Sequence, residues 1–126
     1  SIEVQGNAAF NCADATSDCS FGGSTLISMT GSGNVNLSQA TSAVVPGGAF
    51  TVGKDNTTDN VTLLTNFDLD TAGQDLNVTQ GILEVDDYLM SVHGDANVNA
   101  SGDVLCSGSG SWNLLGTLAG ATTCAP

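Results

Sequence analysis

Short apolar pairs recur at a nearly constant interval along the second half of the chain, and this interval limits the fold more than any other feature. Between Val61 and Leu115 the pairs follow an x-apolar-x-apolar pattern, and their second members fall at positions 63, 69, 78, 85, 92, 98, 106 and 114. An alternation with a period of two is typical of β-strands. Steps of about seven residues leave room for one short strand and one tight corner each.

Two folds join such short strands: an antiparallel meander and a parallel β-solenoid. In a solenoid, three strands and three corners complete one rung of about 22 residues, and inward side chains stack into columns. Regular spacing favours the solenoid, because hairpins vary more in length. We therefore predict one all-β domain over residues 1–126, a short parallel β-solenoid of about five to six rungs. The expected internal columns contain Leu76, Val78, Leu83, Val85, Met90, Val92 and Val98.

The first sixty residues are less regular but carry the same kind of signal. Apolar pairs such as Ile27/Met29 and Phe50/Val52 predict strands there, whereas residues 53–60 form a polar stretch that we expect to be an exposed loop. The 16 glycines favour turns over helices, and no stretch keeps an apolar face at helical spacing. The chain is therefore expected to contain no helix.

The run from Asp75 to Asp103 resembles the degenerate repeats of secreted bacterial parallel β-helix proteins of the autotransporter and filamentous-haemagglutinin type. In that family, units of the Gly-x-Leu-x-Val kind are separated by Gly, Asn and Asp. The resemblance covers about half the chain and implies a structural role at the cell surface or outside the cell. This chain departs from the family in being very short.

Charge excludes several classes of partner. Lys54 is the only Lys or Arg, thirteen residues are Asp or Glu, and the formal net charge is −12. Nucleic acids and anionic membranes both attract clustered basic residues, so neither is an expected partner. No segment is long and apolar enough for membrane insertion, and the start at Ser1 would suit a mature chain whose leader has been removed. Near pH 4 the carboxylates lose their charge, so an acidic habitat, or one rich in divalent ions, would let copies associate.

The four cysteines, Cys12, Cys19, Cys106 and Cys124, predict two disulfides and hence a location outside the cytosol. Pairing Cys12 with Cys19 and Cys106 with Cys124 is the simplest of three connectivities. Their spacing does not match that of a zinc site.

Acidic residues gather in small groups, but no catalytic constellation accompanies them. Calcium ligands are a candidate role, because carboxylates on turns suit a hard cation; a plainly solvated acidic surface is the alternative. The carboxylates concerned are Asp68, Asp70, Glu84, Asp86 and Asp87. His93, the only histidine, is expected to be a solvated turn residue. With few aromatics and no nucleophile beside His93, the chain is not expected to be an enzyme and needs no cofactor other than this candidate calcium ion.

Five N-x-[ST] sequons admit two interpretations. They are glycosylation sites of an exposed protein, or they arise incidentally from a composition rich in Ser, Thr and Asn. They begin at Asn36, Asn56, Asn60, Asn77 and Asn99.

Architecture carries the functional prediction. The ends of a short solenoid expose strand edges, and a second copy can extend them. We expect an extracellular structural subunit that polymerises with identical copies into a pilus-like filament or adhesive surface matrix, with Ile2, Val4 and Phe10 forming the N-terminal contact. An alternative fold is a β-sandwich completed by a neighbour's N-terminal strand. The alternative function is a monomeric secreted module that binds carbohydrate, ice or an adhesion target.

Overall fold

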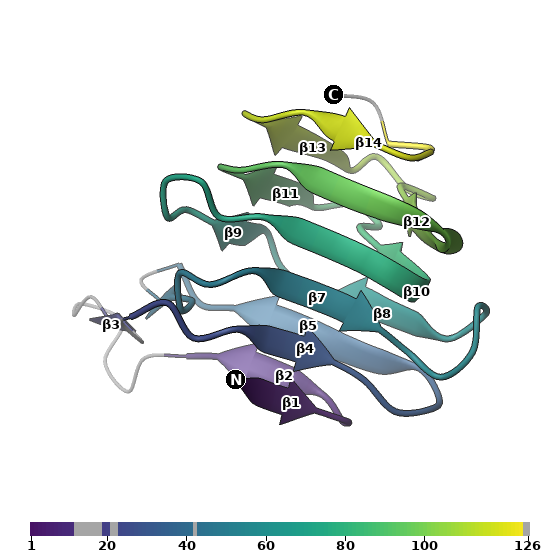
Figure 1. Ribbon diagram of the computed structural model, residues 1–126, viewed down its shortest axis with the longest axis horizontal. Coiled ribbons are helices and arrows are strands. Elements are labelled where there is room, and N and C mark those ends of the chain that lie inside the picture. Colours follow the sequence, from purple (N-terminus) through teal and green to yellow (C-terminus); the bar gives the residue numbers. More distant parts are fainter. Residues whose placement is uncertain (12–18, 21–22, 42, 125–126) are drawn as a thin grey trace.

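The chain winds into a parallel β-solenoid of about five turns (Figure 1). The computed structural model describes residues 1–11, 19–20, 23–41 and 43–124. These residues form strands and no helix, and every pair of adjacent strands is parallel. The predicted solenoid is confirmed, and the alternative β-sandwich is wrong.

Each turn contributes strands to three sides. The first side holds β1 (Ile2–Val4), β4 (Ile27–Met29), β7 (Phe50–Gly53), the first halves of β10 (Leu76–Glu84) and β12 (Ala96–Leu105), and β14 (Leu118–Ala119). The second side holds β2 (Ala8–Phe10), β5 (Val35–Gln39), β8 (Asn60–Leu63) and the second halves of β10 and β12. The third side holds β3 (Cys19–Ser20), β6 (Ala43–Val44), β9 (Phe67–Leu69), β11 (Leu89–Val92) and β13 (Ser111–Leu114).

Strand register gives the length of each turn. On the first side, equivalent positions are Ile2, Ile27, Phe50, Leu76, Ala96 and Leu118. One turn therefore takes between 20 and 26 residues, which brackets the predicted 22.

In the later turns, the first and second strands join into one bent strand rather than two separate ones. β10 and β12 pass the corner with a register shift between Val78 and Gln80. Gly81 follows the shift with a φ of 93°, and a Cβ atom there would come within 2.9 Å of the Lys54 side chain. Because an L side chain rarely adopts this backbone conformation and would meet Lys54, glycine is needed at this corner.

The interior is built from the expected columns, and each of the seven predicted column residues is buried. Phe50 and Phe67 pack with ring centroids 5.2 Å apart at the middle of the stack. Two details differ from expectation. Val104, not Leu105, fills the column beside Leu83, because Leu105 is in register with the outward-facing Glu84.

The polar stretch between β7 and β8 is the second difference. Asp55 to Thr58 are exposed as expected, but the Lys54 side chain is only 2% exposed. Its Nζ donates a hydrogen bond of 2.7 Å to the Thr30 carbonyl of the preceding turn. The side chain therefore folds back along the stack instead of extending into solvent.

Among the residues that the structure describes, the outermost strands at each end of the stack pair with one neighbouring strand. β1 and β2 lie at the first end, and β13 and β14 lie at the other (Figure 1). Ile2 is 49% exposed at the first end and Leu118 is 42% exposed at the second.

Candidate functional sites

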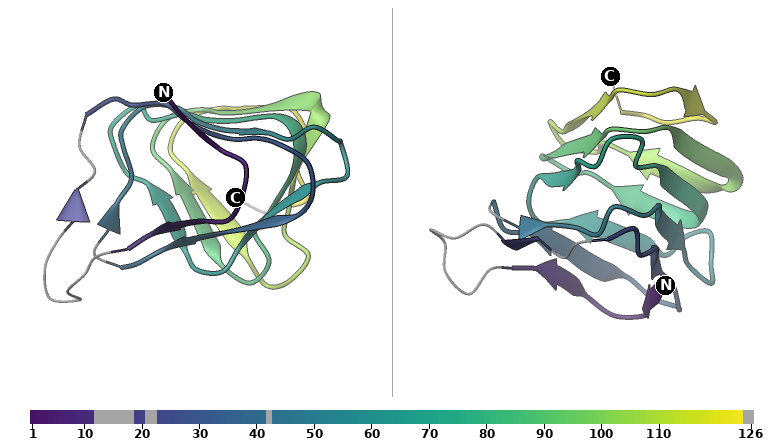
Figure 2. Two further views of the ribbon diagram at one scale, coloured as in Figure 1. Left: turned by 90° about the horizontal axis from the view of Figure 1, so that it is seen from below. Right: turned by 60° about the vertical axis from the view of Figure 1, so that its left-hand side comes forward.

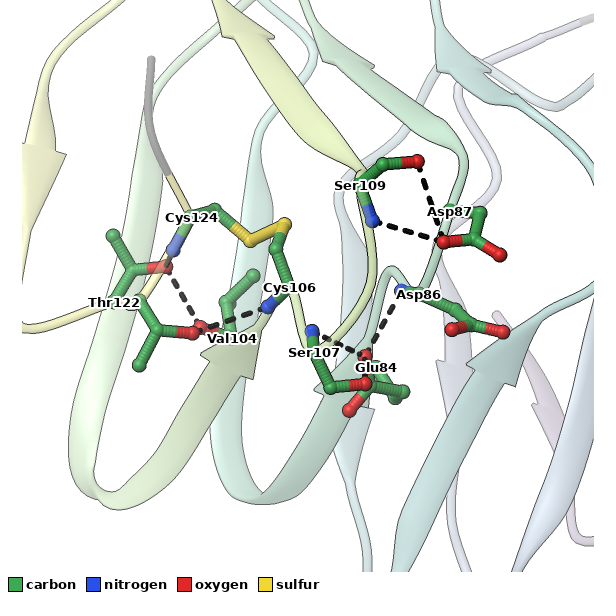
Figure 3. Close-up of a disulfide and its surroundings, with 10 residues drawn as sticks. Glu84, Asp86, Asp87, Val104, Cys106, Ser107, Ser109, Thr122 and Cys124 are labelled. Atoms are coloured by element: carbon green, nitrogen blue, oxygen red, sulfur yellow. Dashed lines mark hydrogen bonds between the residues drawn. A yellow bond between two sulfur atoms is a disulfide. The ribbon is translucent and has the colours of Figure 1, made fainter.

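A disulfide pins the last turn to the body of the solenoid (Figure 3). Cys106 is bonded to Cys124, as predicted. Around it, the Thr122 hydroxyl donates to the Val104 carbonyl at 2.7 Å, and the Cys106 amide donates to the Thr123 hydroxyl at 3.1 Å. Cys12 and the Cys19 side chain lie outside the described residues, so their pairing stays a prediction.

Carboxylates at one corner accept hydrogen bonds from the next turn. Glu84 Oε1 accepts from the backbone amide and the hydroxyl of Ser107, at 3.1 and 2.9 Å (Figure 3). Asp87 Oδ1 accepts from the Ser109 amide at 2.9 Å. Asp86 lies between them with a φ of 58°, and its amide donates to Glu84 Oε1. These acids therefore join adjacent turns.

The same arrangement recurs at another corner. Asp75 Oδ1 accepts from the Asp95 amide at 2.7 Å, and Asp95 Oδ1 accepts from the Thr117 amide at 2.8 Å. Hydrogen bonds from amides to carboxylates are stronger than those between neutral groups. The excess of acidic residues thus has a structural use that composition alone did not reveal.

Asp68 and Asp70 lie on the third side, apart from the acids at the corner. His93 Nε2 is 3.5 Å from Asp68 Oδ1, so the residue expected to be a solvated turn lies beside a carboxylate. Asp68 Oδ1 is buried without a hydrogen-bond partner. Burial, with the nearby Asp70 charge, raises the pKa of Asp68, and His93 opposes this effect.

The candidate calcium ligands do not converge. Within the part of the chain that the structure describes, no three His, Cys, Asp or Glu side chains are placed to hold a metal ion. Asp68 and Asp70 face the third side, whereas Glu84 and Asp87 bond to the following turn. These five carboxylates therefore do not form one metal site.

The charge of Lys54 acts on the carboxylate of Asp59. A side-chain hydrogen bond from Asn56 lowers the pKa of Asp59; backbone hydrogen bonds from Gly33 and Asn56 and the charge of Lys54 add to it, while burial opposes it. The Asn56 Nδ2 to Asp59 Oδ2 distance is 3.0 Å.

The five sequons differ in accessibility. Asn36, Asn56 and Asn99 are exposed. Asn60 is half-buried with an Oδ1 atom that lacks a partner, and Asn77 Oδ1 accepts a hydrogen bond of 3.0 Å from Asn97. A glycan would meet least obstruction at the three exposed positions, and glycosylation stays a prediction.

The third side is interrupted, and an open groove of about 810 Å³ lies at the interruption. Among the described residues, β6 pairs with β3 and β9 pairs with β11, and no pairing joins β6 to β9. Figure 2 shows β3 and β6 standing outside the stacked strands β9, β11 and β13. The lining includes Leu64, Asp68, Asp70, Tyr88 and Leu89.

One side chain bridges the interruption. Gln39 Nε2 donates to the Ala43 carbonyl of β6, and the Asp68 amide of β9 donates to Gln39 Oε1, both at 2.7 Å. Where one strand lies between two others, its peptide groups donate hydrogen bonds to one neighbour and accept them from the other. The Gln39 carboxamide makes the same two kinds of bond. No sequence pattern indicated this role, because Gln39 and Asp68 are 29 residues apart.

The described residues contain no helix that is long and apolar enough to span a bilayer. In comparisons with known proteins, no family model, no curated protein and no solved structure matches this chain.

Proposed function

We propose that this chain is an extracellular structural subunit that assembles head to tail into a filament or surface matrix. The observation that carries the proposal is the pair of open strand edges at the two ends of the stack. Because the strands of each side run parallel, a second copy placed on the end continues the same strand direction and register. A heterologous contact of this kind repeats without closing and gives a filament.

Apolar exposure and the disulfide support this role. Ile2 at one end and Leu118 at the other are both about half exposed and would be covered by a neighbouring copy. Val4 and Phe10, also expected in the N-terminal contact, are partly buried against the core. The Cys106–Cys124 disulfide is weakly consistent with a location outside the cytosol. The kinship with autotransporter and filamentous-haemagglutinin repeats stays a prediction.

The free edge of β1 offers a sharp test. The Ile2 amide donates to Leu26, and the Val4 carbonyl accepts from Thr30, so Ile2 and Val4 face β4. In a parallel pair alternate residues face opposite neighbours, so the Glu3 amide faces the open edge. Glu3→Pro removes that donor while keeping the bonds to β4, and proline is tolerated on edge strands.

Assembly is measured by size-exclusion chromatography and negative-stain imaging between pH 3 and pH 7. We expect wild type to form fibres, more readily near pH 4, where repulsion between carboxylates falls. Glu3→Pro should stay monomeric, and at low molar ratio it should shorten wild-type fibres, because its other end can still add to a growing fibre.

Glu3→Gln is the matched control. It removes the carboxylate that accepts from the Thr30 hydroxyl at 2.8 Å but keeps the backbone amide, so it should assemble like wild type. A wild-type chain that stays monomeric at every pH would refute the proposal and favour a monomeric binding module. Fibres of Glu3→Pro that match those of wild type would show that β1 is not the contact.

A further inference from the structure

We propose that the groove between β6 and β9 binds an extended segment of a different protein that carries Lys or Arg side chains. This site lies on the third side and does not depend on the ends of the stack. Three features of the groove support it: the width of the interruption, the backbone groups that face it and its charge.

The width follows from Gln39. Its carboxamide lies between the Ala43 carbonyl and the Asp68 amide, with a 2.7 Å hydrogen bond on each side. Paired strands are separated by about 4.8 Å, and the peptide group of an intervening strand would make the same two bonds. The interruption is therefore about one strand wide, and Gln39 fills the place of a single peptide group.

Backbone groups face the groove beside Gln39. The His93 amide donates to the Leu69 carbonyl, so Leu69 faces β11, and the alternate residue Asp68 faces the groove. By the same alternation, the Asp68 carbonyl and the Asp70 amide face away from β11. Leu64 and Leu89, 49% and 39% exposed, line the groove. An extended segment would form hydrogen bonds with these two backbone groups and cover the two leucines.

Charge indicates the kind of segment. Asp68 and Asp70 both line the groove, and His93 is the one described basic side chain close to them. A second copy of this chain is a poor source of a cation, since its single Lys or Arg is Lys54, which is buried and bonded to Thr30. Complementary charge at the rim of an interface selects the partner, so a segment from another protein with Lys or Arg fits best.

The test uses a fluorescein-labelled peptide, TVKVKVT, and its acidic counterpart TVEVEVT, titrated with the folded chain at pH 7 and low salt. Fluorescence anisotropy should show binding of the lysine peptide and none of the acidic one. In a ¹H–¹⁵N spectrum, the peptide should shift the amides of Asp68, Asp70 and Leu89. The double variant Asp68→Asn with Asp70→Asn should bind about tenfold more weakly, since two charge contacts are lost.

The matched control is Asp55→Asn with Asp103→Asn, which changes the net charge equally but away from the groove; its affinity should equal that of wild type. Glu3→Pro should also bind normally, so failure of assembly and failure of peptide binding are distinguishable. Circular dichroism confirms that each variant is folded.

Five results would overturn the proposal. Equal binding of the two peptides, or equal binding by the two double variants, would remove the charge argument. Shifts confined to amides outside the groove would place the peptide elsewhere. Chitotriose shifting the groove amides while the lysine peptide does not would make the site one for carbohydrate. A wild-type dimer that the Asp68→Asn with Asp70→Asn variant abolishes would make a second copy the occupant.

Discussion

Replacing Gln39 tests whether one side chain holds the two parts of the third side together. Gln39→Ala removes both 2.7 Å hydrogen bonds and leaves the Ala43 carbonyl and the Asp68 amide without a partner. Both bonds are partly buried, and an unsatisfied buried polar group costs about 1–3 kcal/mol. Allowing for water that enters the open groove, we expect the free energy of unfolding to fall by about 2–3 kcal/mol.

Gln80→Ala is the control, because Gln80 also bridges backbone carbonyls. Its Nε2 donates to the carbonyls of Lys54 and Asp55 at 3.0 and 2.6 Å, and the second bond is exposed. Water can replace these bonds, so the expected loss is about 1 kcal/mol or less. Urea unfolding followed by circular dichroism measures both variants, and hydrogen exchange reports on the Asp68 amide directly.

Two results would refute the reasoning. If Gln39→Ala is no less stable than Gln80→Ala, the bridge contributes nothing beyond a surface contact. If the Asp68 amide stays protected from exchange in Gln39→Ala, it has another partner. A Gln39→Glu variant separates the two bonds, since it keeps an acceptor for the Asp68 amide and loses the donor to Ala43.

Three further predictions follow from the core, the disulfide and the perturbed acids. Leu83→Ala, at a fully buried position, should lower the free energy of unfolding by about 2–5 kcal/mol, whereas the outward-facing Ile82→Ala should cost far less. Replacing Cys106 and Cys124 by serine should cost about 3 kcal/mol, the chain-entropy value for a loop closed over 18 residues, and dithiothreitol should destabilise wild type alone. Asp68→Asn should raise the melting temperature at pH 7. Because folding raises the pKa of Asp68, its ionised form opposes folding above that pKa, and the gain should vanish as the pH falls below about 3.8.

Each of these has a contradicting result. A Leu83→Ala variant as stable as Ile82→Ala would place Leu83 outside the core. A serine double variant with wild-type stability would mean that the hydrogen bonds of Thr122 and Thr123 hold the last turn unaided. For the acids, Asp59→Asn should instead lower the melting temperature at pH 7. The lowered pKa of Asp59 stabilises the fold above pH 3.8, and this contribution is lost as the pH falls. If the melting temperatures of the Asp68→Asn and Asp59→Asn variants shift in the same direction, this would contradict the opposite pKa shifts assigned to the two acids.

The solenoid was predictable because its signal is local and repeated. Every turn places apolar residues two apart on a buried strand, so pairs such as Leu76 and Val78 show the period without any alignment. The Leu105/Cys106 pair was misassigned by one position, since three apolar residues follow one another from Val104 and the register comes only from pairing with β10. The seven-residue step likewise did not distinguish a corner between strands from a bend within one.

The candidate sites were less predictable, because they depend on contacts between turns. Gln39 bonds to a residue 29 positions away, and Glu84 to one 23 positions away. Neither contact leaves a short motif. The interruption between β6 and β9 is also invisible in the sequence, since Ala43 and Phe67 carry the same buried pattern as residues of continuous columns.

The burial of Lys54 has a consequence for the durability of the folded chain. Trypsin-like enzymes cut after Lys or Arg, which their primary pocket recognises by charge. This polypeptide offers them one bond, and the side chain that would enter the pocket is 2% exposed and hydrogen-bonded to Thr30. Such enzymes can therefore digest it only after the surrounding turns of the solenoid open. The same burial keeps amine-reactive labels from its one ε-amino group.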